Sequence, residues 1–551
     1  MAVGDYDFVV VGAGSAGCAV ASRLSEDGRT RVLLLEAGPR DTSFWVHLPI
    51  GYGKTMWSDA VNWRFHTEPE PNMANRRIYW PRGRVLGGSS SINGLIAIRG
   101  QQEDYDRWQA EGCDGWSWRD VLPYFRKLEC NDADDPDGLH GRSGPVSVTS
   151  IRHRHELIEA VIAAAETLGI PRTADFNGPR QEGVGYYQLT TRNGLRMSAA
   201  KAYLKPARGR ANLRVVTGAH ATRVVLDGRR ATGVRFLRDD RSEEQAVTAH
   251  GGVILSAGAL QSPQILMLSG IGPGAELGRH GIPVVVDRPA VGENLQDHLQ
   301  IRLIYRCRRP ITTNDQLNSW IGRVAIGLQW ALARSGPLAV GINQGGLFAR
   351  VLPSSETPDV QFHIATLSAD MAGGEPHPFS GCTLSVCQLR PESRGRVTLA
   401  ARDPQTAPRL VANYLATETD RRCTVEAIKL ARRLAGTHPL AGEIAEEVMP
   451  GPMARTDDDL LTFARQNGAT IFHPSGTCRM GGDADAVTDP RLRVRGVDGL
   501  WVADCSVMPT LVSGNTNLPA IMIGEKAADM IRADTGGGPG GIPRDAGHAA
   551  A

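Results

Sequence analysis

Short apolar runs alternate with glycine-rich turns and with stretches of helical pattern along most of the chain. Residues 8–11 form the first run, and residues 32–35 form a second run that ends at an acid. Similar short runs span residues 213–217, 222–226, 252–256 and 500–504. Apolar runs of this length, bounded by turns, are typical of buried strands. Because helical stretches separate them, the pattern predicts a layered α/β fold.

A glycine-rich loop connects the first predicted strand to a helix of small residues. Gly12, Gly14 and Gly17 form the pattern GxGxxG directly after residues 8–11. In such a loop the first glycine permits a tight turn, the second lets a pyrophosphate approach the backbone, and the third lets the helix pack closely on the strand. The phosphates would lie at a helix N-terminus, where free N–H groups bind anions. The loop therefore predicts a dinucleotide site rather than an empty turn.

The second predicted strand places an acid where a ribose would lie. Glu36 follows residues 32–35 and stands 19 residues after Gly17. A carboxylate at this point can accept hydrogen bonds from ribose hydroxyls, and it would repel the 2′-phosphate of NADP. The motif itself does not separate FAD from NAD. Its place near residue 1 and the late acid-ending run at 500–504 favour FAD.

The length of 551 residues predicts about two domains, since one ordinary core does not grow this large. We expect a Rossmann-type FAD-binding domain and a separate α+β substrate-binding domain. The FAD-binding domain is expected to be discontinuous and to comprise residues 1–155, 195–305 and 478–534. The substrate-binding domain is expected to comprise residues 156–194 and 306–477. Residues 535–551 are rich in glycine and predict a disordered tail.

Composition excludes several classes of partner. The chain has 61 Lys plus Arg and 59 Asp plus Glu, which gives no electrostatic case for binding nucleic acid. The nine cysteines form no CxxC pair and no metal-ligand spacing, so no metal site and a reduced, cytoplasmic location are expected. The first residues do not resemble a signal peptide. No segment approaches the roughly 20 apolar residues of a membrane span.

Five motifs resemble those of the glucose–methanol–choline (GMC) oxidoreductases and follow that family's order. They are RGRVLGGSSSINGLIAIRG at 82–100, GALQSPQILMLSGIG at 258–272, VGENLQDH at 291–298, FHPSGTCRMG at 472–481 and GNTNLPAIMIGEKAADMI at 514–531. The likeness extends over nearly the whole chain and is greatest to bacterial choline-dehydrogenase-like alcohol dehydrogenases. It implies an FAD enzyme that oxidises an alcohol to an aldehyde by hydride transfer to the flavin. The small-molecule alcohol would be the substrate, with a quinone or oxygen as the electron acceptor.

The resemblance also implies which residues bind FAD. Some family members attach FAD covalently through a histidine in the loop after residue 82, but the matching residue here is Ile92. The resemblance therefore implies FAD that is bound non-covalently. A turn residue of the family bonds the adenine through its backbone, and Ala221 is the candidate. The full expected set is Gly12, Gly14, Ser15, Ala16, Gly17, Glu36, Ala37, Arg84, Val85, Gly87, Gly88, Ser89, Asn93, Gly94, Ala221, Asp504, Asn515 and Thr516.

Alcohol oxidation needs a base for the hydroxyl proton and an acceptor for the hydride. No amino acid can take a hydride, so the flavin must be the acceptor. Histidine is the side chain best suited to act as a base near neutral pH. Among the 14 histidines, His473 matches the family's active-site histidine, and Asn515 matches the second residue of the catalytic pair. Asn515 can hold the substrate oxygen but does not titrate usefully, which leaves His473 as the expected base.

A helix is predicted directly after Asn515, and its positive N-terminus would point at the flavin. Asn517 is the expected N-cap, and Pro519 fits the first turn. His363 is a second candidate base, because alternation along residues 360–364 places it on the opposite face of a strand from its apolar neighbours. A structural role for His363 is equally open. His298 is expected to fix a loop.

The sequence gives fewer indications of the substrate. The segment at 341–348 contains Asn343 and Gln344 but no acid, which argues against a quaternary ammonium such as choline. The apolar residues expected to favour an aliphatic or aromatic alcohol are Leu338, Val340 and Ile342.

Four alternatives remain besides an alcohol dehydrogenase. One is an oxidase that passes electrons to oxygen. Another is a lyase like the family's fatty acid photodecarboxylases, which do not need the histidine base, so His473 counts against it. The others are a non-catalytic FAD-binding protein, which the pair of His473 and Asn515 opposes, and an NAD-dependent dehydrogenase.

Overall fold

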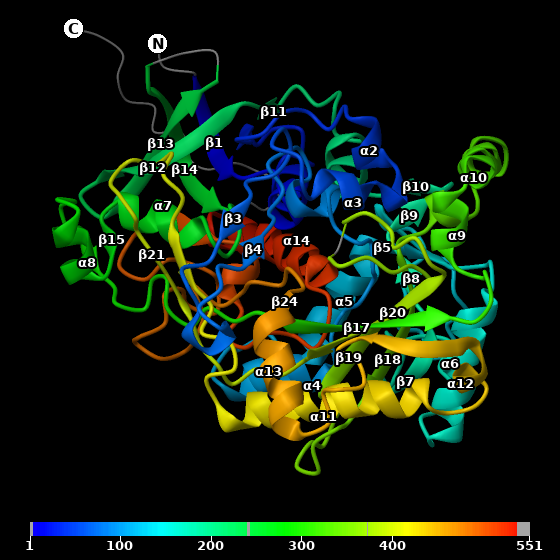
Figure 1. Ribbon diagram of the computed structural model, residues 1–551. Helices are drawn as coiled ribbons and strands as arrows, with labels where there is room; N and C mark the ends of the chain where they lie inside the picture. Colours follow the sequence, from blue (N-terminus) through cyan, green and yellow to red (C-terminus); the bar gives the residue numbers. More distant parts are fainter. Residues whose placement is uncertain (1–3, 240–242, 372, 537–551) are drawn as a thin grey trace, which may run out of the picture.

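The computed structural model describes residues 4–239, 243–371 and 373–536 (Figure 1). Nearly all of the tail expected at 535–551 therefore lies outside the described residues. Two large sheets organise the chain, one in the upper left of Figure 1 and one in its lower right. The predicted α/β fold, with a Rossmann-type unit and a second substrate-binding part, is confirmed.

The first sheet has the strand order β11-β2-β1-β14-β13-β12, with β25 beside β14. Its strands are β1 (Asp5–Val11), β2 (Val32–Leu35), β11 (Leu213–Val216), β12 (Ala219–Asp227), β13 (Arg230–Arg238), β14 (Gln245–Leu255) and β25 (Leu500–Val502). The pairs β1–β2, β1–β14, β2–β11 and β14–β25 are parallel. All four residues of β2 are buried, as expected of a parallel strand covered on both faces. Every apolar run predicted to be a strand of this domain forms one.

Two helices, α1 (Ser15–Leu24) and α14 (Asn517–Asp534), pack against each other beside this sheet. The helix predicted after Asn515 therefore forms, but its cap differs from the prediction. Thr516 occupies the N-cap position, and Asn517 is the first helical residue. The Oδ1 atom of Asn517 accepts a hydrogen bond from Ser15 Oγ at 2.8 Å, so its side chain joins the N-termini of the two helices instead of capping one.

The second sheet is antiparallel and has the strand order β23-β17-β20-β19-β18-β7, with β24 beside β17. Its strands are β7 (Gly183–Tyr186), β17 (Leu299–Cys307), β18 (Asn343–Ala349), β19 (Val360–Ala365), β20 (Gly381–Gln388), β23 (Ile444–Met449) and β24 (Ala469–Thr470). The helices α6 (Glu156–Thr167), α11 (Glu418–Ala435) and α13 (Asp457–Asn467) pack on one face, and α11 runs below the sheet in Figure 1. The domain boundary expected at residue 305 falls inside β17.

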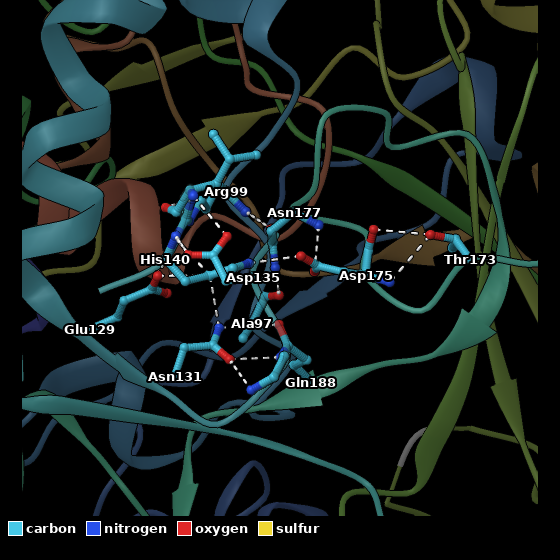
Figure 2. Close-up of polar contacts among 12 residues, drawn as sticks. Ala97, Arg99, Glu129, Asn131, Asp135, His140, Thr173, Asp175, Asn177 and Gln188 are labelled. Carbon is cyan, nitrogen blue, oxygen red and sulfur yellow. Dashed lines mark hydrogen bonds and ion pairs between the residues drawn. The ribbon is translucent and has the colours of Figure 1, made fainter. Parts of the chain in front are cut away.

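A buried polar cluster, shown in Figure 2, joins strand β5 (Glu129–Asn131) to the loops that carry Arg99, His140 and Asp175. His140 lies between Glu129 and Asp175, with Nδ1 2.8 Å from Glu129 Oε1 and Nε2 2.7 Å from Asp175 Oδ2. The guanidinium of Arg99 also pairs with Glu129. Burial alone lowers the pKa of His140, but its hydrogen bonds with Asp175 and Glu129 raise that pKa to about 9. His140 is therefore an imidazolium at neutral pH and joins two acids.

We expect His140→Ala to destabilise the fold by about 3 kcal/mol, because it removes the cation that Glu129 and Asp175 share. The pKa of His140 is about 9 in the folded chain and about 6.5 when unfolded. The contribution of protonated His140 to the free energy of unfolding is then complete below pH 6.5 and is lost as the pH rises through 9. Urea unfolding between pH 6 and 10 measures this. His153→Ala, at an exposed position, is the matched control, and identical pH dependence in His140→Ala and wild type would refute the role.

Candidate active site

One cavity extends from the glycine loop of the first sheet to the inner face of the second sheet. Most of the predicted site residues lie on its wall. These are Gly12, Gly14, Ser15, Ala16, Glu36, Ala37, Gly88, Ser89, Asn93, Gly94, Ala221, His473, Asp504, Asn515 and Thr516. The fold thus brings together segments that are more than 400 residues apart in the sequence.

Two predicted glycines do not line this cavity but allow its wall to form. A Cβ atom on Gly17 would clash with the carbonyl oxygen of Gly12, so only glycine lets α1 pack on the loop, as its place in the motif predicts. Gly87 has φ +89°, a left-handed conformation that favours glycine. Both glycines shape the loops behind the cavity.

Arg84 and Val85 also lie off the cavity wall. Arg84 lies over the ring of Trp63, 5.2 Å from its centroid. Val85 is buried in a small cluster with Val61 and Ile92. Ile92 itself reaches the wall, so carbon occupies the position from which some relatives attach FAD.

The glycine end of the cavity fits a dinucleotide. Gly14 and Gly88 approach so closely that a Cβ atom on Gly88 would lie 2.7 Å from the Gly14 Cα. Bare backbone therefore faces the cavity where a pyrophosphate needs it. The joined N-termini of α1 and α14 add free N–H groups and positive dipole ends, which favour an anionic ligand.

Glu36 is built into the same end of the cavity. Its carboxylate accepts hydrogen bonds from the backbone N–H groups of Ala13, at 3.0 Å, and Gly38, at 2.8 Å. Burial raises the pKa of Glu36 to about 7, against the opposing effect of these bonds. The side chain is held rigidly, and its remaining lone pairs are available to the hydroxyls of a ribose.

His473 and Asn515 meet on the cavity wall although 42 residues separate them. The Nε2 atom of His473 lies 3.2 Å from the amide nitrogen of Asn515. The amide oxygen of Asn515 accepts a hydrogen bond from Gln361 Nε2 at 3.0 Å. This contact orients the amide so that its N–H groups, and not its oxygen, face His473.

His298 determines which ring nitrogen of His473 carries a proton. His298 Nε2 lies 3.0 Å from the carbonyl oxygen of Leu389, which only accepts, so Nε2 carries the hydrogen. Burial lowers the pKa of His298 to about 4, so the ring is neutral and its Nδ1 is an acceptor. His473 Nδ1, 2.9 Å away, must then donate to it. The Nε2 atom of His473 is left with a lone pair that faces Asn515. The expectation that His298 only fixes a loop was therefore incomplete.

The backbone around His473 is also constrained. Phe472, the residue before it, has φ +74°, which is unusual for a bulky side chain and costs energy. The N–H of His473 donates to Asp297 Oδ1 at 2.7 Å, and the N–H of Phe472 donates to Thr470 Oγ1 at 2.7 Å. These bonds hold the strained turn, and they keep the imidazole pointed at the cavity.

Burial keeps the histidines of this site neutral. The pKa of His473 lies well below 6.5, because of burial first and then the nearby His298, His363 and Arg82. Burial likewise lowers the pKa of His363 to about 3. His363 lies on β19, opposite in direction to the core residue Phe362, as the alternation predicts, and it lines the cavity. The amide of Asn515 acts on His363 and raises its pKa against the effect of burial.

The residues expected to contact the substrate are only partly on the wall. Ile342 and Asn343 line the cavity. Leu338 and Val340 are not among its lining residues, and Gln344 turns away to approach Thr366. The expectation of an apolar wall from 338–342 therefore holds only at Ile342.

The sequence did not point to Gln361 or to Arg302, which also belong to this site. Gln361 orients Asn515 through a hydrogen bond between residues 154 positions apart, and no local pattern predicts such a contact. Arg302 lines the cavity from β17. The sequence did contain a pattern that indicates Arg302, since the alternation LQIRLI at 299–304 places a charge on one face of an apolar strand.

Comparison with known proteins agrees with this site. Family models described as GMC oxidoreductase match residues 6–300 and 391–524. An alcohol dehydrogenase [acceptor] from Pseudomonas putida is 42% identical over 529 residues, 96% of this chain and 95% of that protein. The mitochondrial choline dehydrogenase of Homo sapiens is 42% identical over 537 residues, 96% of this chain and 90% of that protein.

Among solved structures, pyridoxine 4-oxidase from Mesorbium loti superposes with a TM-score of 0.86 at 31% identity, covering 95% of this chain and 99% of its own. The likenesses extend over both sheets and over every motif that builds the cavity. The chain belongs to the GMC oxidoreductases, the FAD-dependent family that its motifs indicated.

Proposed function

We propose that this chain oxidises an alcohol to an aldehyde, with His473 as the base and FAD as the hydride acceptor. The observation that carries this proposal is the fixed tautomer of His473, whose Nε2 lone pair faces the cavity beside Asn515. Similarity to an alcohol dehydrogenase over nearly the full chain supports it. The photodecarboxylase-like alternative is not favoured, because it has no need of this base.

The geometry suggests how the residues act on the substrate. The alcohol's O–H would donate to His473 Nε2, while an N–H of Asn515 donates to the same oxygen. Gln361 keeps the Asn515 amide in that orientation. As the proton moves to Nε2, charge develops on the imidazole, and the Nδ1–H bond to His298 strengthens. FAD, when bound, supplies the acceptor for the hydride that leaves the substrate carbon.

The proposed reaction is tested with purified protein under anaerobic conditions. A panel of primary alcohols is added, and loss of the absorbance of oxidised flavin is followed together with formation of the aldehyde. Bleaching with equal amounts of aldehyde and reduced flavin is expected. Re-oxidation by oxygen or by a quinone then identifies the acceptor, for which a quinone is our proposal. Alkane release under blue light, with no bleaching by alcohols, would instead indicate a lyase.

The FAD is expected to be held without a covalent bond, since Ile92 occupies the position of the linking histidine. Precipitation of the protein with acid should release the yellow colour into the supernatant. Flavin that stays in the washed pellet would refute non-covalent binding.

His298 is expected to act by fixing the tautomer of its neighbour. His298→Ala removes the acceptor for the Nδ1–H of His473, so the unproductive tautomer with hydrogen on Nε2 becomes accessible. We expect flavin reduction about 3- to 10-fold slower, the value of one neutral hydrogen bond. His298→Gln offers an acceptor oxygen again and should restore part of the rate. Equal rates in wild type and His298→Ala would refute this positioning role.

A cytoplasmic location is our inference from the cysteines. All nine are free, and all lie in the described part of the chain. Such usage fits a reducing compartment. Within the described ranges, no helix combines the length and the apolar composition that crossing a bilayer requires.

A further inference from the structure

The inner face of the second sheet is polar where it meets the cavity. On this face Arg302 of β17 is paired directly with Ser385 of β20, and Ser385 is paired with His363 of β19. All three line the cavity that contains His473. Side chains at directly paired positions point to the same face, with Cβ atoms about 4.5–5.5 Å apart. A row of polar side chains thus leads from His363, which acts electrostatically on His473, to Arg302.

In the described part of the chain, Arg302 has no partner that neutralises its charge. One nitrogen, Nη2, donates to the carbonyl oxygen of Ala369 at 3.2 Å, and Nε is buried without a hydrogen bond. No ion pair to Arg302 occurs among the residues that the structure describes. Asp370, an acid that acts on it electrostatically, is exposed and pairs with His377 at 3.0 Å. Burial lowers the pKa of Arg302, which reflects how poorly its charge is solvated.

A half-buried cation without an ion partner is costly, so its retention in a cavity calls for a ligand that pairs with it. The other end of the cavity holds its acids. Within the described ranges, the acidic residues on the wall are Glu36 and Asp504. Glu36 lies at the glycine loop, and Asp504 accepts from the N–H of Gly258 and from Ser262 Oγ. The cavity wall around Arg302 therefore offers a positive charge with N–H donors, and none of the described acidic side chains there pairs with it.

We propose that the substrate is an alcohol that carries a carboxylate, and that Arg302 binds the carboxylate while the hydroxyl lies against His473. A guanidinium matches a carboxylate with two parallel N–H donors. Gln300, two residues earlier on the same face of β17, lines the same cavity and can add an amide donor. This inference rests on the proposed alcohol oxidation and specifies its substrate class. It also predicts that choline is a poor substrate, because Arg302 would repel its positive charge.

Arg302 lies four residues along the chain from His298, the direct neighbour of His473, and residues 299–302 are extended in β17, which makes the separation about 13 Å. The hydroxyl and the carboxylate of the substrate must therefore lie several bonds apart. A benzyl alcohol with a para carboxylate and a medium-chain ω-hydroxy acid both have such a separation. Each has an uncharged counterpart of similar shape, so the effect of the substrate's carboxylate can be measured separately from the effect of its shape.

The experiment compares two pairs of alcohols in the FAD-loaded enzyme, 4-(hydroxymethyl)benzoate with 4-methylbenzyl alcohol and 6-hydroxyhexanoate with 1-hexanol. We expect wild type to favour a carboxylate alcohol over its counterpart by about 10- to 100-fold in kcat/KM, the range of a charged hydrogen bond. Arg302→Met should abolish the preference mainly through KM, so that kcat/KM for each carboxylate alcohol falls to that of its neutral counterpart. Arg302→Lys should retain part of it.

Arg306→Met is the matched control, because Arg306 lies on the same strand but is 48% exposed and pairs with Glu446. It should behave as wild type. Binding of benzoate, followed by the change it causes in the flavin spectrum, gives a readout independent of turnover and should weaken at least 10-fold in Arg302→Met. The melting temperature and flavin content of each variant verify that it folds.

The outcomes separate the two proposals. If neutral alcohols bleach the flavin and Arg302→Met leaves the preference ratio and the benzoate affinity unchanged, the carboxylate site is refuted while alcohol oxidation stands. If no alcohol of either kind bleaches the flavin, the proposed function fails. The benzoate titration still decides the role of Arg302 in that case, because equal affinities in wild type and Arg302→Met would overturn it.

Discussion

His473→Ala is expected to keep its FAD and its fold but to reduce the flavin about 100- to 10,000-fold more slowly, the range of a positioned general base. The His298 contact fixes the Nε2 lone pair, and among the residues that the structure describes no second group makes the same contact. His363 lines the same cavity, but among the described residues no second histidine fixes its tautomer as His298 fixes that of His473. Stopped-flow mixing with alcohol under anaerobic conditions measures the rate.

Asn515→Ala is the comparison, because the amide holds the substrate oxygen but takes no proton. Loss of one neutral hydrogen bond should slow reduction only about 3- to 10-fold. The pH dependence gives a second test. Since the pKa of His473 lies well below 6.5, the wild-type rate should stay level from neutral pH to well below 6.5 and then fall as the imidazolium forms. A His473→Ala enzyme with the wild-type rate would move the base elsewhere, with His363 the next candidate.

Glu36→Ala is expected to weaken FAD binding about 10- to 150-fold, which corresponds to about 1.5–3 kcal/mol for a lost charged hydrogen bond. The substitution removes the acceptor for the ribose, and it also leaves the N–H groups of Ala13 and Gly38 without partners. Release of FAD, followed by recovery of its fluorescence on dilution, gives the dissociation constant.

The control for this experiment is Glu26→Ala, since Glu26 is a partly exposed acid just after α1 that pairs with Arg23. It should bind FAD as wild type does. Unchanged affinity in Glu36→Ala would show that this carboxylate is not the ribose ligand.

The first sheet was predictable from the sequence because its signals are local. A short apolar run, a glycine loop and a terminal acid specify β1, α1 and β2 within some 30 residues, and the structure forms each of them. The second sheet was less predictable. Nothing in the residues of β17 indicates which sheet it joins, because its partners β20 and β23 lie far along the chain. The boundary expected at residue 305 consequently falls within that strand.

The site shows the same division. The motifs identified His473 and Asn515, but the contact between them depends on the complete fold. The tautomer of His473 depends on the carbonyl of Leu389, 91 residues from His298, which no motif contains. Asn commonly caps helices, so the sequence predicts a cap at Asn517. In the structure the side-chain oxygen of Asn517 instead accepts a hydrogen bond from Ser15 of another helix.

We expect an alcohol to deliver its hydride to a flavin bound in this cavity. The most direct measurement is anaerobic titration of the purified, flavin-loaded protein with the neutral and carboxylate alcohols described above, while the absorbance of oxidised flavin and the aldehyde product are both followed. We predict complete bleaching with one aldehyde formed per flavin, and almost no bleaching on the same timescale in His473→Ala. A flavin that stays oxidised with every alcohol, although dithionite reduces it, would contradict the account.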